Sequence, residues 1–146
     1  MRKHVLFVCS QARLRSRTAE LLCLFGGMNA RCAGTDPDSL SPITQQAVAG
    51  ARLVVCMEER HSHALRKQGI APDWVVTLAI PDRYDRLEPS LVEILIQRLS
   101  EHAPDVAEAM RRGAALLDSM PGYRKVLGTQ SFEVADNPAY RVLPSV

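Results

Sequence analysis

The sequence predicts an α/β protein in which a four-stranded parallel sheet lies between two layers of helices. Short, continuous apolar runs alternate along the chain with longer segments that are apolar on one side only. Such runs are typical of strands buried on both faces, and the alternation is typical of a parallel sheet. The 146 residues suffice for one ordinary domain. We therefore expect a three-layer sandwich with its functional site at the carboxyl ends of the strands.

Each predicted strand is followed by a predicted helix. The strands are Val5 to Val8, Ala30 to Ala33, Leu53 to Met57 and Trp74 to Leu78. The helices are Ser16 to Phe25, Pro42 to Ala49 with Ser41 as its cap, Glu59 to Gln68, and Pro89 to His102. Gly26-Gly27 ends the first helix, and leucines spaced three or four residues apart give the last one its apolar side.

The segment after Pro104 departs from this alternation. Asp105 to Ser119 predicts an extra C-terminal helix, Met120-Pro121-Gly122 predicts a turn, and the rest is a tail of scattered apolar residues. We therefore divide the chain into a domain of residues 1–103 and a helical extension with a tail, residues 104–146. The extension either packs on the domain or forms a homodimer interface through Leu116, Leu117 and Phe132.

Composition and charge exclude several classes of function. A net charge of +2 gives no support for binding nucleic acid or an anionic membrane surface. No apolar run approaches the length that spans a bilayer, and VLFVC near the start is too short for a signal peptide. We expect a cytoplasmic protein without a metal or organic cofactor. His61 and His63 form H-x-H, which we interpret as two exposed histidines on a helix.

The four cysteines do not form a metal-binding or disulfide pattern. Cys9, Cys23, Cys32 and Cys56 include no C-x-x-C pair. We interpret Cys23 and Cys56 as small buried apolar residues. Cys9 differs because a polar, arginine-rich stretch follows it directly.

The stretch VLFVCSQARLRSRTAE, residues 5–20, predicts an anion-binding loop between the first strand and the first helix. The loop residues that would surround a bound anion are Ser10, Gln11, Ala12, Arg13 and Leu14. Backbone amides of such a loop and the positive end of the helix favour an anion, and Arg15 offers a planar fork to two phosphate oxygens. The same positive surroundings stabilise a thiolate at Cys9, and Ser16 is placed to donate a hydrogen bond to it. Asp82 follows the last strand and is expected at the same rim of the sheet.

Several segments in order resemble the low-molecular-weight protein tyrosine phosphatases. The loop C-x5-R-S, CAGTD at Cys32 to Asp36, ARLVVCMEERH at Ala51 to His61 and IPDRY at Ile80 to Tyr84 are similar to that family's phosphate loop, second turn, third strand and acid loop. The loop is most similar to a short bacterial subgroup of predicted phosphatases in which it reads C-S-Q-N-R-L-R-S. The resemblance runs from about Lys3 to His102, and it implies the phosphotyrosine protein phosphatase I-like fold.

The resemblance implies a role for each matching residue. Cys9 would be the nucleophile, Arg15 the phosphate clamp and Asp82 the general acid, with Asp85 as an alternative acid. Ser16 would assist the thiolate, and Tyr84 would lie at the pocket mouth. The chain departs from the family where Ala12 replaces an asparagine, Arg17 a proline and Cys32 a serine.

We therefore expect a phosphomonoesterase that acts through a cysteinyl-phosphate on a phosphorylated protein or a small phosphomonoester, with inorganic phosphate or sulfate as a ligand. The alternative is a phosphate- or phosphoprotein-binding module with weak or no turnover, which the changes at Ala12 and Cys32 suggest. Arsenate reduction is disfavoured, because no cysteine follows Cys56 to resolve the intermediate.

Overall fold

The protein forms a four-stranded parallel sheet, as predicted. The computed structural model describes residues 4–70 and 74–129. The strands are β1 (His4–Cys9), β2 (Ala30–Gly34), β3 (Ala51–Cys56) and β4 (Val75–Thr77). They lie in the order β2-β1-β3-β4, and every neighbouring pair is parallel. This order brings the carboxyl ends of β1 and β3 together in the middle of the sheet.

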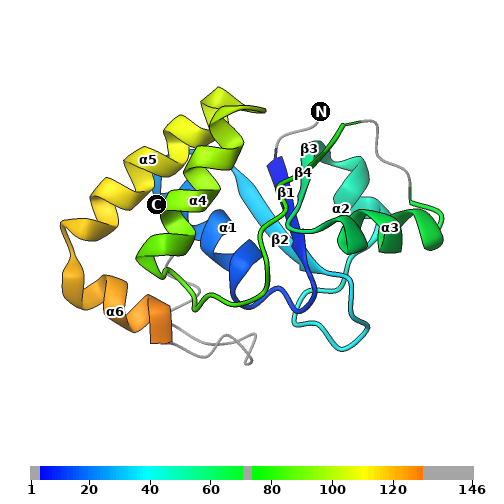
Figure 1. The fold of residues 1–146 in the computed structure, drawn as a ribbon, viewed down its shortest axis with the longest axis horizontal. Coiled ribbons are helices and arrows are strands. Elements are labelled where there is room, and N and C mark those ends of the chain that lie inside the picture. The colour runs from blue at the N-terminus through cyan, green and yellow to red at the C-terminus, as the bar shows by residue number, and fades with distance from the viewer. Residues whose placement is uncertain (1–3, 71–73, 130–146) are drawn as a thin grey trace.

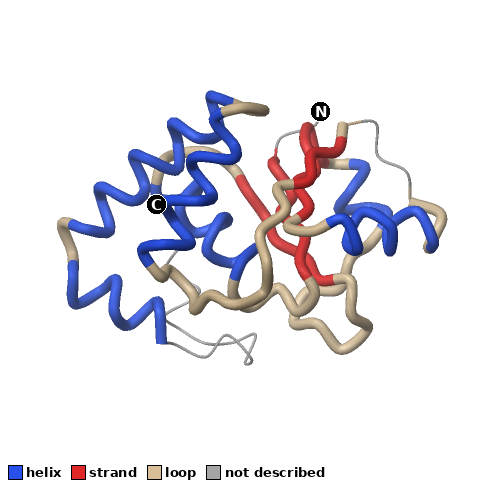
Figure 2. The backbone as a smooth tube through the Cα atoms, viewed as in Figure 1, coloured by secondary structure: helices blue, strands red, loops and turns tan. Residues whose placement is uncertain are grey.

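Helices cover both faces of the sheet, which confirms the three-layer sandwich (Figure 1, Figure 2). One layer contains α1 (Arg15–Phe25), α4 (Pro89–Ser100), α5 (Pro104–Asp118) and α6 (Pro121–Thr129). The other contains α2 (Gln45–Ala49) and α3 (Glu59–Lys67). No helix within the described ranges is long and apolar enough to cross a membrane.

Strand β1 has apolar cores on both of its faces. Val5, Phe7 and Cys9 belong to the larger cluster, which includes residues of α1, α4 and α5. Leu6 and Val8 belong to a smaller cluster with residues of β3 and α3. Successive side chains of a strand point to opposite faces, so an unbroken apolar run is what such a position requires. Cys9 therefore lies on the face covered by α1.

The predicted C-terminal extension packs on the domain. Met110 and Leu117 of α5 are fully buried in the larger cluster, so the proposed role of Leu117 in a homodimer interface is wrong. Leu116 is 40% exposed, and Phe132 lies outside the described residues. The predicted turn at Met120-Pro121-Gly122 is also wrong beyond Met120, because α6 begins at Pro121. Proline fits the first position of a helix, where its missing N–H has no helical partner.

Helix α2 and strand β4 are shorter than predicted. Helix α2 begins at Gln45, and its cap is Thr44, whose side chain accepts a hydrogen bond from the Ala47 amide at 3.0 Å. The preceding residues instead pair beside the end of β2, where Pro42 forms a parallel bridge with Gly34 and the Ile43 amide donates to the Gly34 carbonyl at 3.0 Å. Strand β4 spans only Val75–Thr77, and Trp74 is 62% exposed.

Candidate active site

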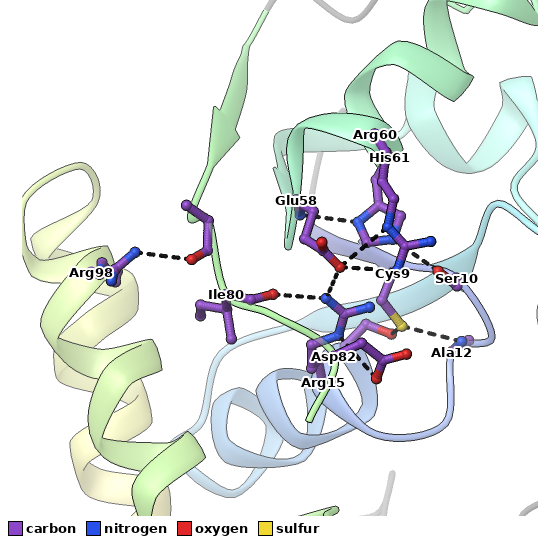
Figure 3. Close-up of polar contacts among 12 residues, drawn as sticks. Cys9, Ser10, Ala12, Arg15, Glu58, Arg60, His61, Ile80, Asp82 and Arg98 are labelled. Atoms are coloured by element: carbon purple, nitrogen blue, oxygen red, sulfur yellow. Dashed lines mark hydrogen bonds and ion pairs between the residues drawn. The ribbon is translucent and has the colours of Figure 1, made fainter. Parts of the chain in front are cut away.

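The loop after β1 holds the sulfur of Cys9 against two polar groups (Figure 3). The Cys9 Sγ lies 2.8 Å from the Ser16 Oγ and accepts a hydrogen bond from the Ala12 amide at 3.2 Å. Cys9 ends β1 and Ser16 lies in the first turn of α1, so a single loop and its flanking elements bring these atoms together. A hydroxyl and an amide that donate to sulfur stabilise a thiolate.

Ala12 adopts a left-handed backbone conformation, which asparagine tolerates better than alanine. Its φ is 60°, and it is fully buried. For residues other than glycine, asparagine and aspartate, this backbone conformation is less favourable than the right-handed one by roughly 1–2 kcal/mol. The loop thus keeps a shape in which the Ala12 amide points at the sulfur, at the cost of local strain.

We expect Ala12→Gly to raise the free energy of unfolding by about 0.5–1 kcal/mol, because glycine has no Cβ to clash at positive φ. Urea unfolding of the two proteins measures the difference. Ala33→Gly is the matched control, since Ala33 is equally buried but lies in β2, where glycine is destabilising. A loss of stability as large for Ala12→Gly as for Ala33→Gly would contradict the assignment of strain to Ala12.

The turn after β2 supports the loop through its backbone. The amides of Thr35 and Asp36 donate to the carbonyls of Cys9 and Ser10 at 2.9 and 3.0 Å. Ser39 Oγ donates to the Gln11 carbonyl at 3.0 Å. A Cβ added at Gly34 would lie 2.5 Å from the Ser10 carbonyl oxygen, so only glycine permits this close approach.

Arg15 is almost completely buried beside the sulfur. It is 1% exposed, and its Nη1 donates to the Ile80 carbonyl at 2.7 Å and to the Glu58 carboxylate. Its Nε lies 3.7 Å from Asp82 Oδ1. Contacts from the N-cap of α3 and from the segment after β4 therefore fix the guanidinium, which is the preorganisation that a phosphate clamp needs.

Glu58 holds two arginines at the edge of the site. Its Oε2 also accepts hydrogen bonds from Arg60, with Nη2 at 3.0 Å and Nε at 3.3 Å. Burial opposes ionisation of the Glu58 carboxyl, but the hydrogen bonds from Arg60 and Arg15 outweigh it and lower its pKa. Glu58 is therefore a carboxylate that orients Arg15, a role that sequence reasoning did not assign.

His61 is a buried part of the site, so the interpretation of both H-x-H histidines as exposed is wrong for His61. It is 1% exposed, whereas His63 is exposed. Its Nδ1 accepts a hydrogen bond from the Glu58 amide at 3.0 Å, so the proton of the neutral ring lies on Nε2. The Nε2 then donates to Ser10 Oγ at 3.0 Å, which leaves the Ser10 hydroxyl hydrogen available for another acceptor.

Burial, and then the charges of Arg15 and Arg60, lower the pKa of His61 from 6.5 to about 4. Above pH 6.5 the ring is neutral in both folded and unfolded chains. As the pH falls toward 4, the unfolded chain binds a proton that the folded chain does not, so stability is lost.

We expect this loss to be about 2–3 kcal/mol larger in the wild-type protein than in His61→Gln. Urea unfolding from pH 7.5 to pH 4 measures it. His63→Gln serves as the control and should keep the wild-type pH profile. Identical profiles for wild type and His61→Gln would rule out a neutral buried His61.

A cavity of about 280 Å³ opens above the sulfur. Its lining includes Cys9, Ser10, Gln11, Arg15 and Asp82. Of the two candidate acids, Asp82 lines this cavity, whereas Asp85 lines a neighbouring one of about 770 Å³ beside α6, which shares Leu14 and Arg86 with it. Asp82 is thus better placed to reach a group bound over Cys9.

Tyr84 does not lie at the mouth of this cavity. It is 9% exposed, belongs to the larger apolar cluster and is not among the residues that line the cavity. The segment after β4 turns its ring inward, so the expected aromatic wall is not formed by Tyr84.

Comparisons with known proteins identify solved structures with a similar fold. A low-molecular-weight protein tyrosine phosphatase from T. tengcongensis matches with a TM-score of 0.53 at 18% identity, over 80% of this chain and 99% of that one. The Erwinia amylovora tyrosine phosphatase AmsI matches at 0.52 and 17%, over 80% and 93%. Wzb of Vibrio vulnificus, in complex with benzylphosphonate, matches at 0.51 and 19%, over 79% and 99%. The chain has the low-molecular-weight phosphatase fold. No model of a protein family and no curated protein matches the sequence.

Within this low-molecular-weight phosphatase fold, two of the sequence departures form one buried contact behind the loop. Arg17 Nη1 lies 2.5 Å from Glu20 Oε1, and the Cys32 thiol donates to the same oxygen at 3.4 Å. Burial, and then the charge of Glu20, raise the pKa of Cys32 well above its ordinary value. Cys32 is therefore a neutral thiol at neutral pH, and the bracing of the loop falls to Ser39 and the turn after β2.

The structure brings most of the predicted site residues together. Cys9, Ser16, Arg15 and Asp82 surround or line the cavity, and the side chain of Gln11 donates to Asp36 at 2.6 Å. Arg13 and Leu14 also line it, whereas Ala12 contributes its amide. Among the described residues, no cluster of histidine, cysteine, aspartate or glutamate is arranged to hold a metal ion.

Proposed function

We propose that the chain is a phosphomonoesterase that transfers a phosphoryl group to Cys9. The observation that carries this proposal is the placement of Cys9 Sγ, which contacts a hydroxyl and an amide at the floor of a cavity that Arg15 also lines. A nucleophile and an anion clamp that share one cavity are the arrangement that phosphoryl transfer to sulfur requires. Wzb, which shares the fold, has been captured with a phosphonate ligand, and this supports a phosphate-like ligand here.

The proposed reaction has two steps. In the first, the Cys9 thiolate attacks phosphorus, a sulfur–phosphorus bond forms and the ester oxygen leaves with a proton from Asp82. In the second, Asp82 takes a proton from water, whose oxygen attacks phosphorus and releases inorganic phosphate and the thiolate. The loop amides and Arg15 stabilise the equatorial oxygens in both transition states, and Ser16 donates to the sulfur as it departs.

A binding module with little turnover is the second candidate. Ala12 is strained, and Arg15 Nη1 is already bonded to Glu58 and Ile80. Both features favour a binding module, because the guanidinium is engaged before a ligand arrives. The Nη2 of Arg15, together with its Nε 3.7 Å from Asp82 Oδ1, still presents one edge of the guanidinium to two phosphate oxygens.

Hydrolysis of p-nitrophenyl phosphate by the purified wild-type chain, measured together with phosphate binding by calorimetry, separates the two candidates. Turnover inhibited competitively by phosphate supports the esterase. Phosphate binding without turnover supports the binding module. The absence of both turnover and phosphate binding would overturn both candidates.

We expect Asp82→Asn to lower kcat/KM for phenyl phosphate about 10²-fold, because the phenolate then leaves without a proton and kcat/KM does not include the later hydrolysis of the cysteinyl-phosphate. The effect on p-nitrophenyl phosphate should be smaller, since its leaving group needs protonation less. Asp85→Asn is the matched control and should change both rates less than about threefold, because Asp85 lines a different cavity. Equal losses for the two esters, or a larger loss in Asp85→Asn, would exclude Asp82 as the acid.

A further inference from the structure

We propose that Arg98 of α4 is a positioning residue for the proposed reaction, because it fixes the turn that carries Asp82 and the carbonyl that binds Arg15. Arg98 is half-buried and is not among the described residues that line the cavity, so it acts through other residues. The inference rests on the proposed function for its effect on turnover, and phosphate binding gives it a second readout.

The chain leaves the sheet at Ala79, shortly after β4. Ala79 has a φ of 57°, in the left-handed region, which is unfavourable for alanine. It is exposed, so burial of its own side chain does not hold it there. The amides of its neighbours Leu78 and Ile80 both donate to carbonyls at the end of β3, at 3.0 and 2.8 Å. The chain therefore turns at this one residue, and such a conformation persists only where surrounding contacts maintain it.

Arg98 supplies a contact of this kind from α4. Its Nη1 donates to the Leu78 carbonyl at 2.5 Å and to the Ala79 carbonyl at 3.2 Å (Figure 3). These two carbonyls belong to the peptide groups before and after the Ala79 Cα. The backbone torsions of Ala79 set how the two peptide groups lie relative to each other, so one nitrogen that bonds to both restrains those torsions.

The restrained turn leads directly to the clamp and the acid. Ile80, the next residue, is fully buried, and its carbonyl accepts from Arg15 Nη1 at 2.7 Å. Two residues further on, Asp82 Oδ1 lies 3.7 Å from Arg15 Nε. A change in the torsions of Ala79 would move the Ile80 carbonyl and Asp82 together. Small displacements of catalytic groups lower rates strongly, so Arg98 affects catalysis without touching the substrate.

The test compares kcat/KM for phenyl phosphate and for p-nitrophenyl phosphate. We expect Arg98→Gln to lower the first about twentyfold and the second about fivefold, because a displaced Asp82 penalises most the leaving group that needs a proton. Arg98→Lys should keep both values within about threefold of wild type, since an ammonium can still donate to both carbonyls. A general loss of folded protein would lower both values equally and would leave their ratio unchanged.

Arg112→Gln is the matched control. Arg112 also donates to a backbone carbonyl, that of Gly26, from Nε and Nη2 at 3.1 and 2.9 Å. This contact joins α5 to the end of α1 and does not involve the residues that line the cavity. Arg112→Gln should therefore leave the ratio of the two kcat/KM values as it is in the wild-type chain.

Ala79→Gly, added to Arg98→Gln, tests whether Arg98 acts through the turn. Glycine adopts a positive φ without the penalty of a Cβ, so the turn then depends less on the bonds from Arg98. We expect the double variant to recover part of the lost kcat/KM for phenyl phosphate. A ratio that Arg98→Gln does not change, or no recovery on adding Ala79→Gly, would overturn the proposal.

Calorimetry with inorganic phosphate tests the same role without turnover. Arg98→Gln should weaken phosphate binding about threefold, because Arg15 is then less well oriented, while Arg112→Gln should not change it. Weaker phosphate binding by Arg98→Gln, in a chain that hydrolyses neither ester, would support this inference and overturn the proposed enzyme. Turnover and phosphate binding that Arg98→Gln leaves unchanged would do the reverse.

Discussion

Replacing Cys9 with serine is expected to lower kcat for p-nitrophenyl phosphate at least about 10⁴-fold, because a hydroxyl without an adjacent general base is a poor nucleophile at neutral pH. The substitution changes one atom, and Ser16 and the Ala12 amide contact that atom directly. Phosphate binding should persist, since Arg15 and the loop backbone remain. Steady-state kinetics and calorimetry on the same preparation measure both quantities.

Cys32→Ser is the matched control for the loss of a thiol. Cys32 is buried behind the loop with its thiol on Glu20, and it takes no part in the proposed reaction. The kcat of Cys32→Ser for p-nitrophenyl phosphate should stay within a few-fold of the wild-type value. Turnover that survives Cys9→Ser would exclude Cys9 as the nucleophile, whatever the result for Cys32→Ser.

Arg15→Lys is expected to lower kcat/KM about 10³-fold, with a matching loss of phosphate affinity. Lysine keeps the charge but not the planar fork, which here binds the Ile80 carbonyl and Glu58 with one nitrogen and leaves others for the phosphoryl oxygens. The two-oxygen contact in the transition state is therefore lost. Kinetics with p-nitrophenyl phosphate and calorimetry with phosphate give the two numbers.

Arg60→Lys provides the comparison for Arg15→Lys. Arg60 binds the same Glu58 carboxylate, but its side chain is 57% exposed and is absent from the lining of the cavity. We expect a change of less than about threefold, as for an exposed ion pair. If both substitutions reduce activity equally, Arg15 acts only through the charge network around Glu58 and is not a phosphate clamp.

The sequence predicted the sheet and the loop because both depend on local patterns. The unbroken apolar run of β1 requires a strand buried on both faces, and Cys9, Arg15 and Ser16 follow one another closely at its end. These residues lie close together in space because one short loop joins β1 to α1. Asp82 was predicted from the rule that parallel strands end at one edge of the sheet.

The rest of the site depends on contacts between distant segments, which no local pattern reveals. Glu58 and His61 lie on a charged stretch that is typical of a solvated helix, yet they bond to Arg15 and Ser10 across the carboxyl edge of the sheet. The only sign of Glu58 and His61 in the sequence is the segment MEERH, which belongs to the resemblance to the low-molecular-weight phosphatases. Tyr84 and Leu117 were misjudged for a similar reason, since their burial is decided by the packing of the segment after β4 and of α5.

The crystal structure of the protein with orthovanadate tests the central claim most directly, because vanadate adopts the five-coordinate geometry of phosphoryl transfer. We predict vanadium bonded to Cys9 Sγ, its equatorial oxygens on the loop amides and on Arg15, and Asp82 facing the apical oxygen. Vanadate bound away from the sulfur, or Cys9 left unligated at saturating vanadate while Arg15 keeps only its bonds to Glu58 and Ile80, would contradict the account.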